Sequence, residues 1–200
     1  KAYCTGAIFF EVPNCLAALQ KVAAYHRSKF DMPVIGITGS NGKTTIKEWL
    51  YQLLHPSFNI VRSPRSFNSQ VGVPLSVWKM YSSYDLAIFE AGISTTGEMQ
   101  QLASIIKPTM GVLTHMGPAH AEGFNSMSEK IKEKLQLFEM VDTLIYGKDQ
   151  IQGYNLEGDV SVFKRPVTFY SWSRLVPATL VVTSEINKGS FTEMTVSYGG

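Results

Sequence analysis

The stretch MPVIGITGSNGKTTIKEWLYQLL, residues 32–54, contains three structural signals in succession. An apolar run of strand length leads into a turn of Gly, Thr, Ser and Asn, and a helical pattern follows directly after Lys43. The apolar residues of that pattern recur at helical spacing and predict one buried stripe, formed by Ile46, Trp49, Leu50, Leu53 and Leu54. A strand, a glycine-rich turn and a helix in this order favour phosphate binding.

The turn supplies the groups that a phosphate site requires. Its backbone N–H groups and the start of the helix can surround an anion, Lys43 adds a positive charge, and Thr44 can place its hydroxyl on a magnesium ion. We therefore assign nucleotide binding to Gly39, Ser40, Asn41, Gly42, Lys43, Thr44 and Thr45. The match to the G-x-x-x-x-G-K-[ST] pattern is imperfect, because Ile37 stands where the first glycine is required. The alternative is an ordinary polar turn with a solvated lysine.

Strand and helix patterns alternate through most of the chain. Strands are expected at residues 7–13, 34–38, 58–62, 85–92, 110–115 and 142–147, and helices at 44–54, 69–80, 97–107 and 126–140. This alternation predicts an α/β, P-loop-containing fold with a mostly parallel, doubly wound sheet and helices on both faces. From Gln152 onward short strand patterns predominate, at residues 160–164, 167–172, 178–184 and 191–200, and we expect a short antiparallel extension at the C-terminal end of the sheet.

Composition narrows the classes of partner. The 200 residues are 44% hydrophobic and 17% charged, which is enough apolar material for one sizeable core. A net charge of +2 with scattered basic residues argues against nucleic-acid binding, and no apolar run is long enough for membrane insertion. The only two cysteines lack metal-ligand spacing and no signal-peptide pattern opens the chain, so we expect a cytoplasmic protein.

Polar residues at the ends of two expected strands are candidates for chemistry. Glu90 ends a buried strand, where open α/β sheets bind their ligands, and its carboxylate can hold magnesium directly or through water. A simple surface carboxylate is the competing interpretation. His115 and His120 follow the next strand, and each can also be an ordinary loop histidine.

Lys134 is singled out by helix geometry. On a helix over residues 127–139 it falls within the apolar arc that contains Ile131 and Leu135, while Glu133 falls on the opposite, polar face. A buried ammonium must reach solvent, pair with an acid or lose its charge. We therefore predict a functional role for Lys134, with a lysine that merely reaches solvent as the alternative.

Five motifs in this order resemble the central ATPase domain of the Mur ligases of peptidoglycan synthesis: GITGSNGKTT, FNSQVGVP, EAGISTTGEM, AHAEGF and EKLQLF. The versions NGKTTIKEW, GVPLSV and AHAEGF are similar to those of the branch that adds D-alanyl-D-alanine, and the resemblance covers residues 7–147. It implies an ATP-dependent acid-amino-acid ligase that joins D-Ala-D-Ala to a UDP-N-acetylmuramoyl-tripeptide through an acyl phosphate.

The resemblance also implies roles for individual residues. Lys43 would bind the β- and γ-phosphates of ATP, and Thr44 and Glu90 would hold a first Mg²⁺ ion. His120 would bind a second Mg²⁺ ion together with Lys134, which would react with CO₂ to form a carbamate. These implications make Lys43, Glu90, His120 and Lys134 the candidate catalytic residues.

Substrate contacts are implied at a turn before the third helix. Asn68 and Ser69 fall where the family has an asparagine-rich turn beside the substrate. Ser69 replaces the second asparagine of that turn, and the segment GISTTGE lacks an asparagine that the family often has there. The third residue of the peptide substrate, lysine or diaminopimelate, is left open.

A division into domains follows from the same resemblance. Residues 1–30 correspond to the end of an N-terminal UDP-sugar-binding domain and a linker helix, and residues 31–200 to an incomplete central ATPase domain, with the C-terminal domain absent. We expect a monomer that is inactive as an isolated fragment. Two alternatives are a folylpolyglutamate synthase-like ligase, which shares the ATPase core, and a nucleotide-binding module without catalytic activity.

Overall fold

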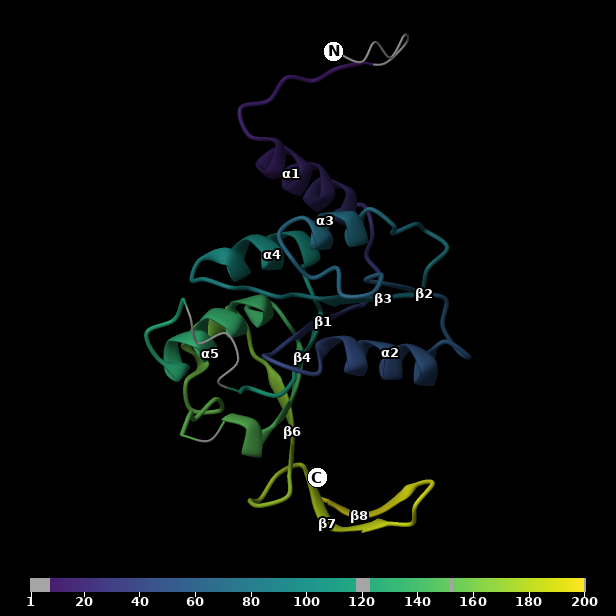
Figure 1. Ribbon diagram of the computed structural model, residues 1–200, viewed down its shortest axis with the longest axis vertical. Coiled ribbons are helices and arrows are strands. Elements are labelled where there is room, and N and C mark those ends of the chain that lie inside the picture. The colour runs from purple at the N-terminus through teal and green to yellow at the C-terminus, as the bar shows by residue number, and fades with distance from the viewer. Residues whose placement is uncertain (1–7, 118–122, 152, 200) are drawn as a thin grey trace.

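The computed structural model describes residues 8–117, 123–151 and 153–199 (Figure 1). Its strands are β1 (Val34–Thr38), β2 (Ile60–Arg62), β3 (Leu86–Glu90), β4 (Met110–Leu113), β5 (Thr143–Gly147), β6 (Thr168–Ser173), β7 (Leu180–Asn187) and β8 (Thr192–Tyr198). Its α-helices are α1 (Cys15–Arg27), α2 (Lys43–Leu54), α3 (Gly72–Val77), α4 (Glu98–Ile106) and α5 (Met127–Leu135). Three short 3₁₀ helices are η1 (Gln136–Phe138), η2 (Lys148–Ile151) and η3 (Val160–Val162).

The strands form one sheet in the order β2-β3-β1-β4-β5-β6-β7-β8. Neighbouring strands from β2 to β7 pair in parallel, and β7 and β8 pair in antiparallel fashion. The predicted fold class is therefore confirmed. The antiparallel part is limited to the last hairpin, because β6 joins β5 in parallel with Thr168 opposite Thr143.

The two faces of the sheet are covered by different helices. Val34 on β1 belongs to a core under α1, α3, α4, α5 and η1, whereas Ile35 and Ile37 belong to a second core under α2. Figure 1 shows α3 and α4 above the sheet and α2 below it. Alternate residues of a strand point to opposite faces, so a strand buried on both sides reads as the continuous apolar run seen in the sequence.

The apolar stripe predicted for α2 is only partly correct. Its inner side packs on the sheet through Ile46, Leu50, Tyr51 and Leu54. Trp49 and Leu53 are instead 61% and 75% exposed, and Lys47 is completely buried. The helix therefore places a lysine where its sequence pattern predicted only apolar contacts.

Helix α1 is capped at its start and attached to the rest of the fold at its end. The side chain of Asn14 accepts a hydrogen bond from the Ala17 N–H at 2.9 Å and so caps the helix. Arg27, at the other end, donates to the carbonyl oxygens of Ile106 and Lys107 at 2.9 and 3.1 Å. These carbonyls end α4, so α1 is fixed to the helix layer of the sheet.

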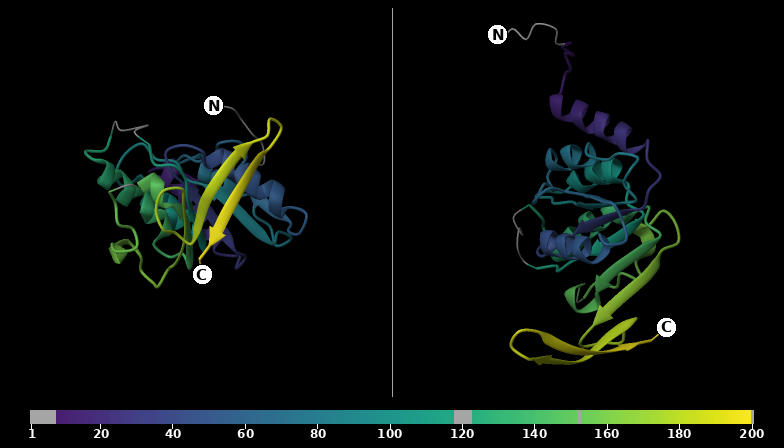
Figure 2. Two further views of the ribbon diagram at one scale, coloured as in Figure 1. Left: turned by 90° about the horizontal axis from the view of Figure 1, so that it is seen from below. Right: turned by 90° about the vertical axis from the view of Figure 1, so that its right-hand side faces the viewer.

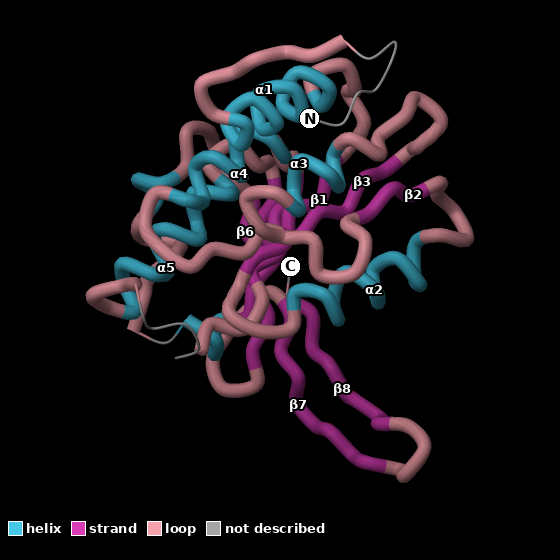
Figure 3. Tube along the Cα trace, turned by 45° about the horizontal axis from the view of Figure 1, so that its top comes forward, coloured by secondary structure: helices cyan, strands magenta, loops and turns pink. Residues whose placement is uncertain are grey.

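Two expected strands are not formed. Residues 8–13 of the first are exposed and irregular, and residues 160–162 of another form η3. The hairpin of β7 and β8 extends away from the rest of the sheet (Figures 2 and 3), and its β8 side chains are exposed. None of the helices within residues 8–117, 123–151 and 153–199 has both the length and the apolar character needed to cross a bilayer.

Candidate functional site

The loop of residues 39–45, named here the phosphate loop, is held between the ends of two adjacent strands. The N–H groups of Ser40 and Asn41 donate to the carbonyl oxygen of His115 at 2.8 and 3.4 Å. The Thr114 hydroxyl donates to the Asn41 carbonyl oxygen at 2.6 Å. Because β1 and β4 are parallel neighbours, the segments that follow them leave the sheet at the same edge. The segment after β4 therefore holds the phosphate loop, which follows β1, in place.

Two glycines of the phosphate loop are required for different reasons. At Gly39 the φ angle is +149°, and a Cβ atom would collide with the Thr114 hydroxyl oxygen. At Gly42 the φ angle is +81°, in the left-handed region, although a Cβ atom there would meet open space. Gly42 precedes the first turn of α2, so it lets the chain turn into the helix with its N–H groups directed outward.

Lys43 folds back over the phosphate loop. Its ammonium group donates to the carbonyl oxygens of Gly39 and Ser40 at 3.0 and 3.3 Å. Burial lowers the pKa of Lys43, and the positive charge of Lys130 lowers it further, while the Glu90 carboxylate opposes both effects. A cation therefore lies directly over the loop that offers backbone N–H groups to an anion.

Thr44 and Glu90 meet beside this lysine. The Thr44 hydroxyl donates to Oε2 of Glu90 at 3.0 Å, and the Asn68 amide donates to the same oxygen at 3.4 Å. Glu90 is 0% exposed at the end of β3, so its carboxylate is oriented entirely by protein groups. A hydroxyl and a carboxylate are the oxygen donors that Mg²⁺ prefers, so these residues fit a magnesium ion.

Two further lysines approach from α5. Lys134 is 3% exposed and Lys130 is 2% exposed, and the Lys130 ammonium donates to the Gly117 carbonyl oxygen at 2.8 Å. The pKa of Lys134 falls to about 8, first because it is buried and then because Lys43 and Lys130 are close. Three cations thus gather around the phosphate loop, which is the charge pattern expected of a polyphosphate site.

The position of α5 is fixed at its start and by contact with α4. The Ser126 side chain accepts from the Glu129 N–H at 3.1 Å and caps α5. Glu133 accepts from the N–H groups of Gly97 and Met99 at 2.8 and 3.1 Å, at the start of α4. The prediction that Glu133 lies on the exposed face is therefore wrong, because the N-terminus of α4 supplies partners for its buried charge.

The other residues that the sequence marked as candidates lie in different places. His120 lies outside the residues that the structure describes. Asn68 joins Glu90, whereas the Ser69 hydroxyl accepts from the Gly72 N–H at 3.2 Å and so serves the start of α3. His115 contributes its backbone carbonyl to the phosphate loop, while its ring contacts the side chain of Gln150 in η2.

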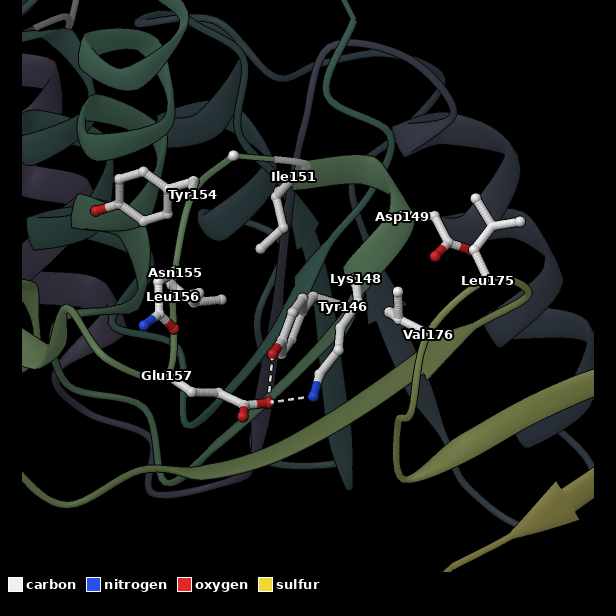
Figure 4. Close-up of a pocket in the computed structure, with 11 residues that line it drawn as sticks. Tyr146, Lys148, Asp149, Ile151, Tyr154, Asn155, Leu156, Glu157, Leu175 and Val176 are labelled. Carbon is white, nitrogen blue, oxygen red and sulfur yellow. Dashed lines mark hydrogen bonds and ion pairs between the residues drawn. The ribbon is translucent and has the colours of Figure 1, made fainter.

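A cavity of about 400 Å³ lies beyond β5, with η2 in one wall (Figure 4). The Tyr146 hydroxyl donates to the Glu157 carboxylate at 2.5 Å, and the Lys148 ammonium lies 3.3 Å from it. Burial and this hydrogen bond raise the pKa of Tyr146. The cavity adjoins η2, whose Gln150 contacts His115. The residues that line the cavity form no recognisable sequence motif.

Sequence reasoning missed Lys47, Lys130 and Glu133. For Lys47 a usable signal existed, because it follows Lys43 by four positions and so lies on the same side of α2. Lys130 likewise precedes Lys134 by four positions on α5. Glu133 had no such signal, since its partners are backbone N–H groups of another helix.

Comparison with known proteins agrees with this geometry. The family model for the Mur ligase middle domain matches residues 37–197. The chain belongs to the Mur ligase family. Within that family, a UDP-N-acetylmuramoyl-tripeptide--D-alanyl-D-alanine ligase from Borreliella burgdorferi is 34% identical over 151 residues, which cover 70% of this chain and 32% of that protein. The enzyme of the same name from Bacillus subtilis is 32% identical over 126 residues, covering 63% of this chain and 28% of the relative.

The Mur ligase fold is also found among solved structures. The MurF ligase from Thermotoga maritima in complex with ADP superposes with a TM-score of 0.82 at 23% identity, covering 98% of this chain and 45% of that chain. The apo form of the L. casei FPGS superposes with a TM-score of 0.68 at 13% identity, and the match covers 95% of this chain and 57% of that chain. This Mur ligase chain therefore spans about a third of the length of the curated relatives, and less than half of the Thermotoga structure.

Proposed function

We propose that this chain is the ATP-binding part of a ligase that adds D-Ala-D-Ala to a UDP-N-acetylmuramoyl-tripeptide. The observation that carries the proposal is the junction of Lys43, Thr44 and Glu90 at the end of the parallel sheet. Relatives that are 34% and 32% identical bear the name of that enzyme, which supports the choice of substrates. In such a reaction the tripeptide carboxylate attacks the γ-phosphate of ATP and ADP leaves. The amine of D-Ala-D-Ala then attacks the carbonyl carbon of the acyl phosphate, phosphate leaves, and the nitrogen loses a proton to give the amide.

The residues of this chain act mainly by binding and orienting the phosphates. The N–H groups of the phosphate loop and the Lys43 ammonium bind the β- and γ-phosphates, and Lys130 and Lys134 add positive charge from α5. Thr44 and Glu90 would hold Mg²⁺, which offsets the negative charge that develops on the transferring phosphoryl group. The Asn68 amide keeps the Glu90 carboxylate turned toward Thr44.

Lys134 serves this site as a carbamate. Its burial and its pKa of about 8 give it a larger neutral fraction near pH 7.5 than an ordinary lysine has. The neutral amine attacks CO₂, a C–N bond forms, and one proton leaves to solvent, so the product is an anion. With His120, this anion would hold a second Mg²⁺ ion.

The rival functions are less well supported. A folylpolyglutamate synthase shares the fold, but the FPGS neighbour superposes less closely than the MurF ligase does. A module without catalytic activity has no need for two buried lysines, Lys130 and Lys134, beside the half-buried Lys43 at one loop. We also propose that residues 1–30 are the end of a UDP-sugar-binding domain and a linker helix, and that residues 31–200 belong to an incomplete central ATPase domain. The protein is proposed to work as a cytoplasmic monomer.

The test uses the intact protein and measures ADP release. Release should require both UDP-N-acetylmuramoyl-tripeptide and D-Ala-D-Ala, and Lys43→Ala should lower kcat by about a hundred-fold or more. Lys79→Ala, which removes an exposed lysine, is the matched control and should retain activity. Turnover with a folate and glutamate instead would support the synthase, and nucleotide binding without turnover on either substrate set would support the module.

A further inference from the structure

Lys47 is a buried cation to which the proposed function assigns no role. It lies one helical turn after Lys43 on α2, and none of its surface is exposed. Its ammonium donates to the Ser63 carbonyl oxygen at 2.8 Å, to the Arg65 carbonyl oxygen, and to Oε1 of Glu90 at 3.1 Å. A lysine ammonium has three N–H donors, so these contacts use all of them.

These contacts join three separate parts of the site. Lys47 comes from the helix that begins at the phosphate loop, Ser63 and Arg65 follow β2, and Glu90 ends β3. The Ser63 hydroxyl also accepts from the Glu90 N–H at 3.2 Å, so the backbone and the carboxylate of Glu90 are both held from this side. The contacts with the two carbonyl oxygens therefore fix the Lys47 ammonium, and the ammonium in turn restrains the Glu90 carboxylate.

The two oxygens of Glu90 differ in their main partners. Lys47 donates to Oε1 only and Asn68 to Oε2 only, while the Thr44 hydroxyl lies 3.0 Å from Oε2 and 3.3 Å from Oε1. A carboxylate that is fully removed from water requires a counter-charge, and Lys47 supplies one at 3.1 Å before any metal binds. Oε2, which has no contact with Lys47, is then the carboxylate oxygen nearer to the Thr44 hydroxyl.

We propose that Lys47 is a positioning residue of the magnesium site. By holding Oε1 of Glu90, it aims Oε2 at the place where a metal ion would also contact Thr44. This inference rests on the proposed function, since it concerns the same nucleotide and metal site. An ion pair with only a structural role would change stability and leave the magnesium dependence of nucleotide binding unchanged.

The experiment measures the affinity of the intact protein for a fluorescent ADP analogue, first in EDTA and then over a Mg²⁺ titration. In Lys47→Met the affinity in EDTA should equal that of the wild type, because Lys43 and the phosphate loop are intact. The Mg²⁺ concentration for half-maximal enhancement should rise about ten-fold or more, the usual effect of removing a partner that orients a metal ligand. Unchanged magnesium dependence in folded Lys47→Met overturns the inference.

Two other variants separate the possible causes. Glu48→Gln removes the other carboxylate near Lys47, whose oxygen lies 3.3 Å from the ammonium, and should leave the magnesium dependence unchanged. Lys43→Ala should weaken binding with and without Mg²⁺. If the wild type shows no magnesium-enhanced binding, the proposed function fails. If the wild type shows it and Lys47→Met has the same magnesium dependence, the positioning role alone fails.

Lys47→Met removes a buried charge and so challenges folding. Lys47→Gln, which retains an N–H donor for the two carbonyls, is therefore measured in parallel. Either variant that is unfolded in EDTA and regains its fold with Mg²⁺ supports the proposal, because the metal then supplies the missing charge. Variants that remain unfolded at every Mg²⁺ concentration show a structural role and overturn it.

Discussion

At the scale of single residues, the phosphate loop depends on one close approach. Gly39 lies so near Thr114 that no side chain fits between β1 and the segment after β4. The same threonine donates to the Asn41 carbonyl oxygen, so any displacement there also disturbs the rest of the loop. Backbone spacing, and not only the charge of Lys43, therefore controls whether the loop can bind phosphate.

Alanine substitutions at the two glycines test this dependence. Gly42→Ala should lower the free energy of unfolding by about 1–2 kcal/mol, since only its left-handed backbone is strained. Gly39→Ala should cost more and should also weaken ADP binding, because the new methyl group displaces Thr114. Urea denaturation and nucleotide titration measure both effects. Equal stability of the two variants would contradict the steric argument.

Lys134 provides a second test at this scale. Lys134→Ala should lower kcat of the intact enzyme by about a hundred-fold or more, and acetate should restore part of the activity by replacing the missing anionic oxygen. In the wild type, ¹³CO₂ should give a carbamate signal in carbon NMR that Lys134→Ala lacks. Full activity of Lys134→Ala would show that the lysine serves only packing.

At the scale of elements, α5 brings its lysines to the phosphate loop through a short helix with a well-defined start. Ser126 and Glu129 form the cap, and Glu133 attaches the helix to the start of α4. The α-helix ends at Leu135 and continues as η1, so Lys134 lies in its last turn. The placement of both α5 lysines therefore depends on the cap and on the contact with α4.

Two N-cap substitutions form a matched pair for this dependence. Ser126→Ala and Asn14→Ala should each lower the free energy of unfolding by about 1 kcal/mol, because each removes one cap hydrogen bond. Only Ser126→Ala should also weaken ADP binding, since α5 carries Lys130 and Lys134 while α1 carries no residue of the site. Equal ADP affinities in the two variants would show that α5 is held without its cap.

The strands and helices also show which parts of the fold could be predicted from the sequence. Strands β1 and β3 were recognised because burial on both faces leaves an unbroken apolar run, and their parallel pairing follows from the helices between them. Residues 160–162 were mistaken for a strand because a short apolar pattern does not distinguish a strand from a 3₁₀ turn.

The site was predictable where chemistry follows a motif. Lys43, Thr44 and Glu90 stand at strand and helix ends, and the structure brings them together. Lys47 was missed because its partners are two carbonyls and a carboxylate from other parts of the chain. The spacing of four from Lys43 indicates only which side of α2 Lys47 occupies, because long-range partners of that kind leave no local pattern in the sequence.

At the scale of the whole molecule, the groups of the site come from β1, β3, α2 and α5 and meet at one edge of the sheet. The residues that we propose to bind phosphate and metal lie there, and the Borreliella relative is about three times as long as the part that this chain matches. Bringing an acyl phosphate and an amine together requires positioning groups on both sides of the reacting atoms. We therefore expect that nucleotide binding can occur in a protein that does not form the amide bond.

A protein of residues 1–200 alone should bind Mg-ADP weakly and form no amide bond. The reason is that domain closure, which would position the second substrate and exclude water, is expected to need the further length that the relatives have. Mass spectrometry of a reaction with ATP, UDP-N-acetylmuramoyl-tripeptide and D-Ala-D-Ala should detect no pentapeptide product, while the intact protein provides the positive control. Repeated turnover by the 200 residues would refute this expectation.

The central position of β1 also bears on how the chain acquires its fold. β1 pairs with β3 and β4, not with β2, which follows it in the sequence. A chain emerging from the ribosome must therefore close two long crossovers, each with an entropic cost, before this strand has both neighbours. Until His115 has been synthesised, the N–H groups of Ser40 and Asn41 lack their partner. Nucleotide should consequently stabilise the finished domain by mass action without assisting the early steps of its folding.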